Sequence, residues 1–148
     1  MKINNDSTKN RWRRGNALVE AALAAPMLLL LLSGVIDFGR AFYFADIAAG
    51  AARAGAQYGV LSSANVGNTA GMEAAAREEA AGVPSGIFSV TAEFYCQNSA
   101  GARQADCSDA TWEEYVSVKT NITYALMMPW PGLANPLNIG GISVMRVQ

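Results

Sequence analysis

One carboxylate, that of Glu20, stands inside a long apolar run that begins just after a basic N-terminus. Residues 17–36 are twenty positions in which Glu20 is the only charged side chain. At 1.5 Å per residue, a helix of that length is about 30 Å long, which matches the hydrocarbon thickness of a bilayer. Residues 21–36 alone would span only about 24 Å, so Glu20 is predicted to lie at or just inside the membrane boundary. A charge there is costly, which indicates a function.

Few residues of this chain are suited to catalysis, because it has no histidine. A conventional Ser or Cys triad and an HExxH metal site are therefore excluded. The adjacent Glu113 and Glu114 point to opposite faces of a predicted strand, and Glu78 and Glu79 diverge by about 100° on a predicted helix. We predict that the protein is not an enzyme, binds no cofactor or metal, and has no small-molecule substrate.

The distribution of charge predicts the orientation of the membrane helix. Residues 1–15 contain five Lys or Arg and one Asp, a net charge of +4. The positive-inside rule keeps this tail in the cytoplasm and sends everything after Ile36 across the membrane. From Asn16 onward, six Lys or Arg face eleven Asp or Glu, a net charge of −5. This acidity argues against a nucleic-acid partner.

The membrane helix is predicted to continue through residues 37–60, which are rich in alanine and contain no proline. One apolar stripe recurs there at three- and four-residue steps. Its members are Phe38, Phe42, Ala45, Ala49, Ala52 and Ala56. Small residues, including Gly50 and Gly55, permit close packing either against the protein's own head or against copies of the same helix.

The remainder of the chain predicts a small head with one helix and three strands. Thr69 can cap a helix over residues 70–81, with Glu73 and Arg77 paired one turn apart. The strands show period-2 alternation. Their apolar positions are Val90, Ala92, Phe94 and Cys96 in the first strand, Val116, Val118, Thr120, Ile122 and Tyr124 in the second, and Ile142 and Val144 in the third. Residues 127–136 form a stiff apolar loop that folds back over the sheet or contacts a membrane or partner.

Cys96 and Cys107 are the only two cysteines of the chain. The predicted topology places both in an oxidising compartment, where we expect a structural disulfide; a redox-active pair is the alternative. Closing a loop of about twelve residues would stabilise the head by somewhat under about 3 kcal/mol on the chain-entropy model.

Several of these residues resemble a known family. Residues 35–43 and 51–56 resemble the TadE-like family, minor pilins (pseudopilins) of the bacterial tight-adherence (Tad or Flp) type IV pilus system, and residues 143–147 fit that family's last strand. The residues that carry the resemblance include Asp37, Phe38, Gly39, Arg40, Arg53 and Gly55. Gly15 and Glu20 before an apolar helix resemble the start of type IV prepilin-like proteins. Ala21 departs from the family, which usually has an aromatic residue there.

The resemblance implies that a prepilin peptidase cleaves after Gly15, which makes Asn16 the mature N-terminus and Glu20 its fifth residue. The Asn16 ammonium of one subunit would then pair with the Glu20 carboxylate of a neighbour, which offsets the burial of both charges. The alternative is a plain signal anchor in which Glu20 reaches the lipid headgroups.

Together these features predict an α+β, pilin-like protein with four parts. They are a basic cytoplasmic leader (residues 1–15), a transmembrane helix (16–36), a helix extension (37–60) and an extracytoplasmic head (61–148) with a roughly three-stranded antiparallel sheet. The resemblance implies a minor pilin of the bacterial inner membrane, with its N-terminus inside, that primes or joins a pilus used for attachment. Its partners would be membrane lipid, the prepilin peptidase, other pilins and the inner-membrane platform. The alternative is a bitopic envelope protein whose head binds another component without entering a filament.

Overall fold

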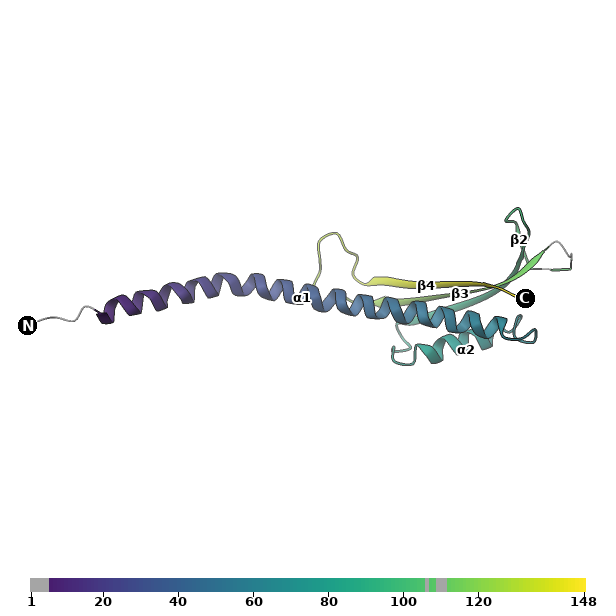
Figure 1. Cartoon of the computed structure of the whole chain (residues 1–148), viewed down its shortest axis with the longest axis horizontal. Coiled ribbons are helices and arrows are strands. Elements are labelled where there is room, and N and C mark those ends of the chain that lie inside the picture. Colours follow the sequence, from purple (N-terminus) through teal and green to yellow (C-terminus); the bar gives the residue numbers. More distant parts are fainter. Residues whose placement is uncertain (1–5, 106, 109–111) are drawn as a thin grey trace, which may run out of the picture. The chain divides into compact units, whose positions relative to one another are not determined.

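The computed structural model describes residues 6–105, 107–108 and 112–148. Its elements, in chain order, are α1 (Asp6–Val60), α2 (Thr69–Glu79), β1 (Phe88–Gln97), β2 (Arg103–Gln104), β3 (Glu113–Tyr124) and β4 (Leu137–Arg146) (Figure 1). The predicted α+β class with a long N-terminal apolar helix is therefore confirmed. The chain divides into two compact units, Met1–Phe38 and Gly39–Gln148. We call the second unit the head unit.

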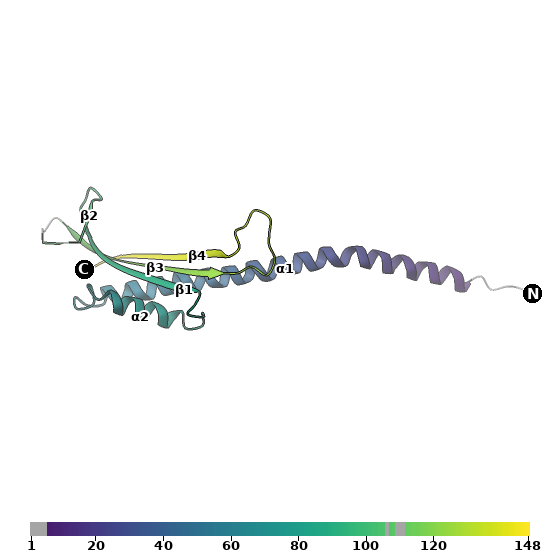
Figure 2. The same cartoon turned by 180° about the vertical axis from the view of Figure 1, so that it is seen from behind.

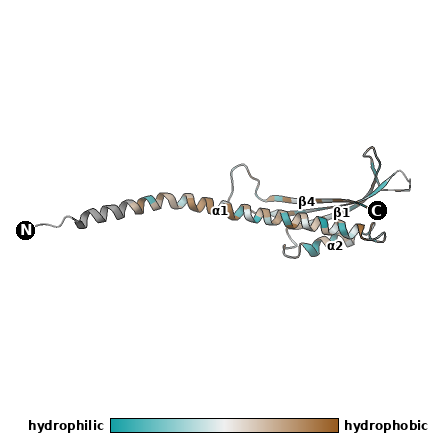
Figure 3. Ribbon diagram, viewed as in Figure 1, coloured by the Kyte–Doolittle hydropathy of each residue, from teal (hydrophilic) through white to brown (hydrophobic). Residues whose placement is uncertain are grey.

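The first unit consists, over its described residues, of the first part of α1. This helix begins at Asp6 and so includes most of the predicted leader, although Lys2 and the rest of residues 1–5 lie outside the described residues. The hydropathy colouring of α1 shows an apolar segment followed by a stretch of mixed character (Figure 3). Pro26 lies inside the helix and cannot donate a backbone hydrogen bond to the preceding turn.

The head unit contains an antiparallel sheet with the strand order β2-β1-β3-β4. β1 pairs with β3 from Phe88 opposite Ile122 to Gln97 opposite Glu113. The sheet has four strands rather than the three expected, because two-residue β2 adds to the end of β1. Two residues are too few to produce an alternation that a sequence pattern can reveal.

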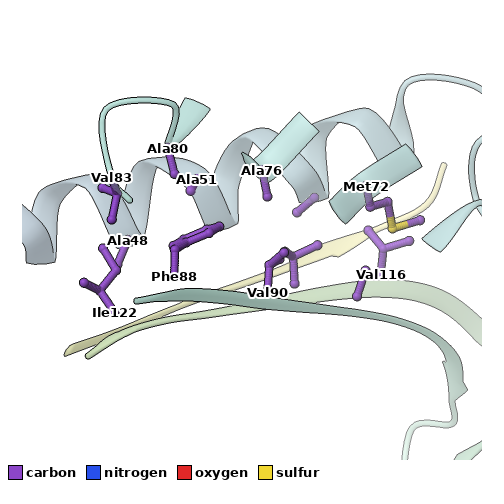
Figure 4. Close-up of a cluster of buried hydrophobic side chains, with 13 residues drawn as sticks. Ala48, Ala51, Met72, Ala76, Ala80, Val83, Phe88, Val90, Val116 and Ile122 are labelled. Carbon is purple, nitrogen blue, oxygen red and sulfur yellow. The ribbon is translucent and has the colours of Figure 1, made fainter. Parts of the chain in front are cut away.

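The second part of α1, together with α2, covers one face of this sheet (Figure 2). Small side chains of α1 meet larger side chains of α2 and of the strands in a single core (Figure 4). Its buried members include Ala48, Ala51 and Ala56 of α1, Met72 and Ala76 of α2, and Phe88, Val90, Val116, Val118 and Ile122 of the sheet. The expected packing of the small residues of α1 against the protein's own head is therefore present.

The buried stripe of α1 agrees with the prediction only in its far half. Ala52 and Ala56 are fully buried, but Phe42 is 72% exposed. The buried line runs instead through Ala48 and Ala51. Alanine occupies so many positions in this segment that its sequence gives little contrast between the two faces of the helix.

The predicted inward positions of the third strand were wrong. Ile142 is 65% exposed and Val144 is also exposed, whereas Ser143 is buried. The register explains the reversal, because residues directly opposite one another in an antiparallel pair share a face. Val118 of β3 faces the helices, and its partner in β4 is Ser143.

The start of α2 lies one residue earlier than expected. Asn68, not Thr69, is the N-cap, and its side-chain oxygen accepts a 2.9 Å hydrogen bond from the Gly71 amide. The predicted Glu73–Arg77 pair is present, with 3.8 Å between Oε2 and Nη2. Both Asn and Thr are good N-cap residues, so residue type alone does not show which of the two adjacent positions is the cap.

Candidate membrane and assembly segment

Apart from Glu20, residues 17–36 of α1 carry no charged side chain on any face of the helix. Large side chains between Leu18 and Ile36 are exposed to the surroundings rather than packed within the chain. Helix Ala17–Val60 contains a window with a mean hydropathy of 2.1, and its length and composition are sufficient to cross a membrane. Exposure of this much continuous apolar surface to water is unfavourable, so a lipid or protein environment is required.

Glu20 is the feature of this segment that is capable of specific chemistry. Its side chain is exposed in α1, among Ala17, Leu18 and Leu23, which are exposed as well. Its carboxylate accepts hydrogen bonds and pairs with cations, and apolar surroundings strengthen such pairing. Positions 16 and 20 are one helical turn apart, about 6 Å along the axis. Pairing between Glu20 and the Asn16 ammonium of a neighbouring chain stays a prediction.

The proposed cleavage position lies within helix. α1 runs without interruption through the Gly15–Asn16 peptide bond. Further along, the Ser33 hydroxyl donates a 3.0 Å hydrogen bond to the carbonyl oxygen of Leu30. This bond satisfies a polar side chain inside the apolar segment, where an unsatisfied hydroxyl is costly.

Residues 37–40 fall into four different environments. The side chain of Asp37 is fully buried, and no buried side-chain oxygen or nitrogen among the described residues lacks a hydrogen-bond partner. Phe38 is exposed. A Cβ atom added to Gly39 would meet nothing within 4 Å. The side chain of Arg40 contacts Tyr124 of the sheet.

The guanidinium carbon of Arg40 lies 4.9 Å from the centre of the Tyr124 ring, a cation–π geometry. The Phe44 ring, one turn further along α1, lies 5.2 Å from the same ring. These residues join the start of the head unit's helix to the last residue of β3. The sequence offered no signal for this contact, because it depends on how the helix and the sheet pack.

Gly55 is the family residue that packs most tightly. A Cβ atom there would lie 2.8 Å from the Met72 carbonyl oxygen and 3.0 Å from Val118 Cγ1. Only glycine therefore fits where α1, α2 and β3 converge. Arg53 is exposed and lies outside the core. The structure thus brings Arg40 and Gly55 into contact with the sheet, but it does not bring Arg53 into the core beside them.

Two further groups lie at the end of β1. Cys96 and Cys107 form the predicted disulfide, with their Cα atoms 5.5 Å apart. No pattern in the sequence signals the neighbouring aromatic pair, in which the ring of Tyr95 stacks on that of Tyr115 with 5.8 Å between centres. The guanidinium of Arg103 lies 4.4 Å from the Tyr95 ring. Strand register alone creates this cluster.

Glu113 connects that aromatic pair to β4. Its Oε2 accepts a 2.8 Å hydrogen bond from the Tyr115 hydroxyl, and its Oε1 lies 2.9 Å from Arg146 Nη1. The hydrogen bond to Glu113 raises the pKa of Tyr115 above its ordinary value of 10.0, and partial burial and the charge of Glu113 act in the same direction. The group is a structural network that ties β3 to β4.

Comparison with known proteins gives one family match, which covers most of α1. Residues 15–57 match the family model described as TadE-like protein. No curated protein and no solved structure shows a significant match to the chain. The matched residues include Gly15, Glu20 and Gly55, together with residues 37–40. The match confirms, over residues 15–57, the resemblance to the TadE-like family seen in the sequence.

Proposed function

We propose that this TadE-like protein is a minor pilin that primes or joins a tight-adherence pilus involved in attachment. The observation that carries the proposal is Glu20, the one charged residue among residues 17–36 of an exposed apolar helix. In a bilayer such a charge is a liability, but in a helical assembly it finds a partner in a neighbour's N-terminal ammonium.

In this proposal, a prepilin peptidase removes residues 1–15 and the inner-membrane platform receives the mature chain. The head unit remains on the far side of the membrane from the N-terminus. The role is structural, and the absence of histidine from the chain supports this. The competing function is that of an anchored envelope protein whose head binds another component without entering a filament.

The test compares membrane insertion with pilus-dependent attachment in the Glu20→Ala variant. Removal of the carboxylate takes a costly charge from the apolar segment, so insertion should be unchanged or slightly easier. Attachment should fail, because the Asn16 ammonium is left buried without a partner, a loss of several kcal/mol where water is excluded.

Asp46→Ala is the matched control, because Asp46 is an exposed carboxylate of α1 beyond the apolar segment. It should leave both insertion and attachment intact. Normal attachment by an inserted and processed Glu20→Ala protein would refute the pairing role and favour the anchored envelope protein.

A further inference from the structure

The connection between β3 and β4 is an apolar loop without charge. Residues 120–145 contain no Asp, Glu, Lys or Arg. Within them, we call residues 125–136 the apolar loop. Met127 is 68% exposed, Met128 and Leu133 are exposed as well, and Trp130 is half-buried. Exposed apolar side chains gathered on one uncharged loop favour contact with an apolar medium.

The base of the apolar loop is closed by one side chain. Asn135 Oδ1 accepts a 3.1 Å hydrogen bond from the Leu126 amide, and Asn135 Nδ2 donates a 3.4 Å bond to the Leu126 carbonyl oxygen. Leu126 itself is buried. At the tip, the Leu133 amide donates to the Trp130 carbonyl oxygen at 3.2 Å. The prolines of the loop have no amide hydrogen, which reduces the number of donors that leave water when the loop enters an apolar medium.

The apolar loop departs from the end of the head unit at which the chain enters that unit. Tyr124, the last residue of β3, contacts Arg40 and Phe44 near the start of the unit's helix. Arg40 lies four residues after Ile36, where the apolar run ends, which is about 6 Å along a helix. The headgroup region extends about 5–8 Å beyond the hydrocarbon on each side. If residues 17–36 cross the hydrocarbon, Arg40 is close enough along the chain to reach the lipid phosphates.

We propose that the apolar loop inserts its tip, residues 127–133, into the surface of the bilayer that α1 crosses. The occupant of this surface is lipid at the boundary between headgroups and acyl chains. Met127, Met128 and Leu133 supply the apolar contact, and Trp130 lies at the interfacial depth that indole rings favour. The inference rests on membrane insertion of α1 but not on the pilin role.

This contact gives the head unit a second attachment to the membrane. The first is the covalent continuation of α1, and the second is the apolar loop, which β3 and Asn135 hold in place. Arg40 stacks on Tyr124 at the base of the loop, so insertion of the loop tip would bring its charge toward the lipid phosphates. The two attachments together restrict rotation of the head unit about the axis of α1.

The experiment measures quenching of tryptophan emission by brominated lipids in the full chain, inserted into phosphatidylcholine vesicles. The chain has three tryptophans, Trp12, Trp112 and Trp130. One variant, Trp12→Phe with Trp112→Phe, keeps only Trp130. The matched control, Trp12→Phe with Trp130→Phe, keeps only Trp112. Trp112 precedes β3 and the apolar loop follows it. The twelve residues of that strand span about 40 Å, so Trp112 lies far from the loop.

Vesicles are prepared with bromine close to the headgroup or deep in the acyl chain. Trp130 should lose most of its emission with the shallow quencher and less with the deep one, whereas Trp112 should keep its emission with both. Flotation of each variant with the vesicles establishes insertion before the measurement. Equal quenching of Trp130 and Trp112 would overturn the proposal. Absence of quenching of Trp130 by either lipid would also overturn it and would indicate a protein partner as the occupant of the loop surface.

A charge at the loop tip provides an independent test. Met127→Glu in the background that keeps only Trp130 should reduce quenching, because a carboxylate resists entry into the acyl region. Leu61→Glu is the matched control, since Leu61 is 78% exposed just after the end of α1. Unchanged quenching in Met127→Glu would contradict insertion of the tip. Neither result depends on pilus assembly, so failure here and failure of the Glu20→Ala test are distinguishable.

Discussion

The Thr120 hydroxyl donates a 2.7 Å hydrogen bond to the carbonyl oxygen of Ala48, and the bond is buried. It connects the centre of β3 directly to the backbone of α1. Gly141 of β4 lies opposite Thr120, and a Cβ atom at Gly141 would lie 2.8 Å from the Ala49 amide nitrogen. The helix therefore approaches the sheet most closely at this point.

The Thr120–Ala48 bond should contribute measurably to the stability of the head unit. Thr120→Val keeps the shape of the side chain but removes the donor, so we expect a loss of about 1 kcal/mol in the free energy of unfolding. Denaturation of the full chain in detergent micelles, followed by near-UV circular dichroism, measures this loss. Thr91→Val on the exposed face of β1 is the control and should change stability by less than about 0.5 kcal/mol. Equal effects of the two variants would contradict the role assigned to the bond.

Gly141 should not tolerate any side chain. Gly141→Ala places a methyl group against the backbone of α1, which cannot move without shifting the whole helix, and overpacking of this kind costs about 1–3 kcal/mol. Gly140→Ala is the comparison, because its new Cβ would meet only the Thr120 carbonyl oxygen, at 3.3 Å. The same denaturation measurement should rank Gly141→Ala as clearly the less stable. The reverse order of stability would show that α1 and β4 are further apart at Gly141 than the structure indicates.

Removal of the disulfide should weaken the head unit without affecting the membrane helix. Replacement of Cys96 and Cys107 by serine should lower the free energy of unfolding by somewhat under about 3 kcal/mol, because the unfolded chain regains the freedom of the closed loop. Membrane insertion, measured by alkaline extraction, should be unchanged. Non-reducing mass spectrometry of the protein recovered from cells should find the bond, and two free thiols would count against the predicted orientation.

Tyr115 makes a pH-dependent contribution to the stability of the head unit. Its folded-state pKa is raised above 10.0, chiefly by the hydrogen bond to Glu113. The contribution is therefore fully present below pH 10 and is lost as pH rises through the folded-state pKa. Glu113→Gln removes the negative charge and should lower the pKa of Tyr115 toward its ordinary value, as measured by NMR titration of ring-labelled tyrosine. Tyr115→Phe assigns the signal, and an unchanged pKa in Glu113→Gln would refute the stated cause.

Processing should occur at the junction between the basic tail and the apolar segment. Co-expression with a prepilin peptidase should give a chain that begins at Asn16, and Gly15→Val should block cleavage because a side chain is introduced at the scissile bond. Gly34→Val, a change within the apolar segment away from the junction, should be processed normally. N-terminal sequencing distinguishes the products, and an intact N-terminus in membranes that contain active peptidase would favour the plain anchor.

The sequence was sufficient to predict β1 and β3, because most of their buried positions follow the alternation of the sequence, with Tyr95 and Ser117 buried outside it. Val116, Val118 and Ile122 are fully buried, as expected. It was insufficient for β4, where contact with α1 selects Gly141 and Ser143 for the inner face. A pattern that seeks apolar residues assigns that face to Ile142 and Val144 instead.

The candidate site divides in a similar way. Glu20 and the disulfide were evident from residue type and spacing alone. The contact of Arg40 with Tyr124 was not, because it requires the docking of α1 on the sheet, which neither segment encodes by itself. Pairing of Glu20 involves a second chain and therefore stays a prediction.

The core of the head unit has a consequence for chimaeric proteins. The family match ends at residue 57, yet the head unit begins at Gly39, so the family segment supplies Ala48, Ala51 and Ala56 to the core. An exchange of N-terminal segments between this chain and a protein that shares the matched segment, with its junction after residue 57, would pair one protein's helix with another protein's sheet. A junction at residue 38 would keep both halves of the core in one parent and transfer only the first unit, residues 1–38.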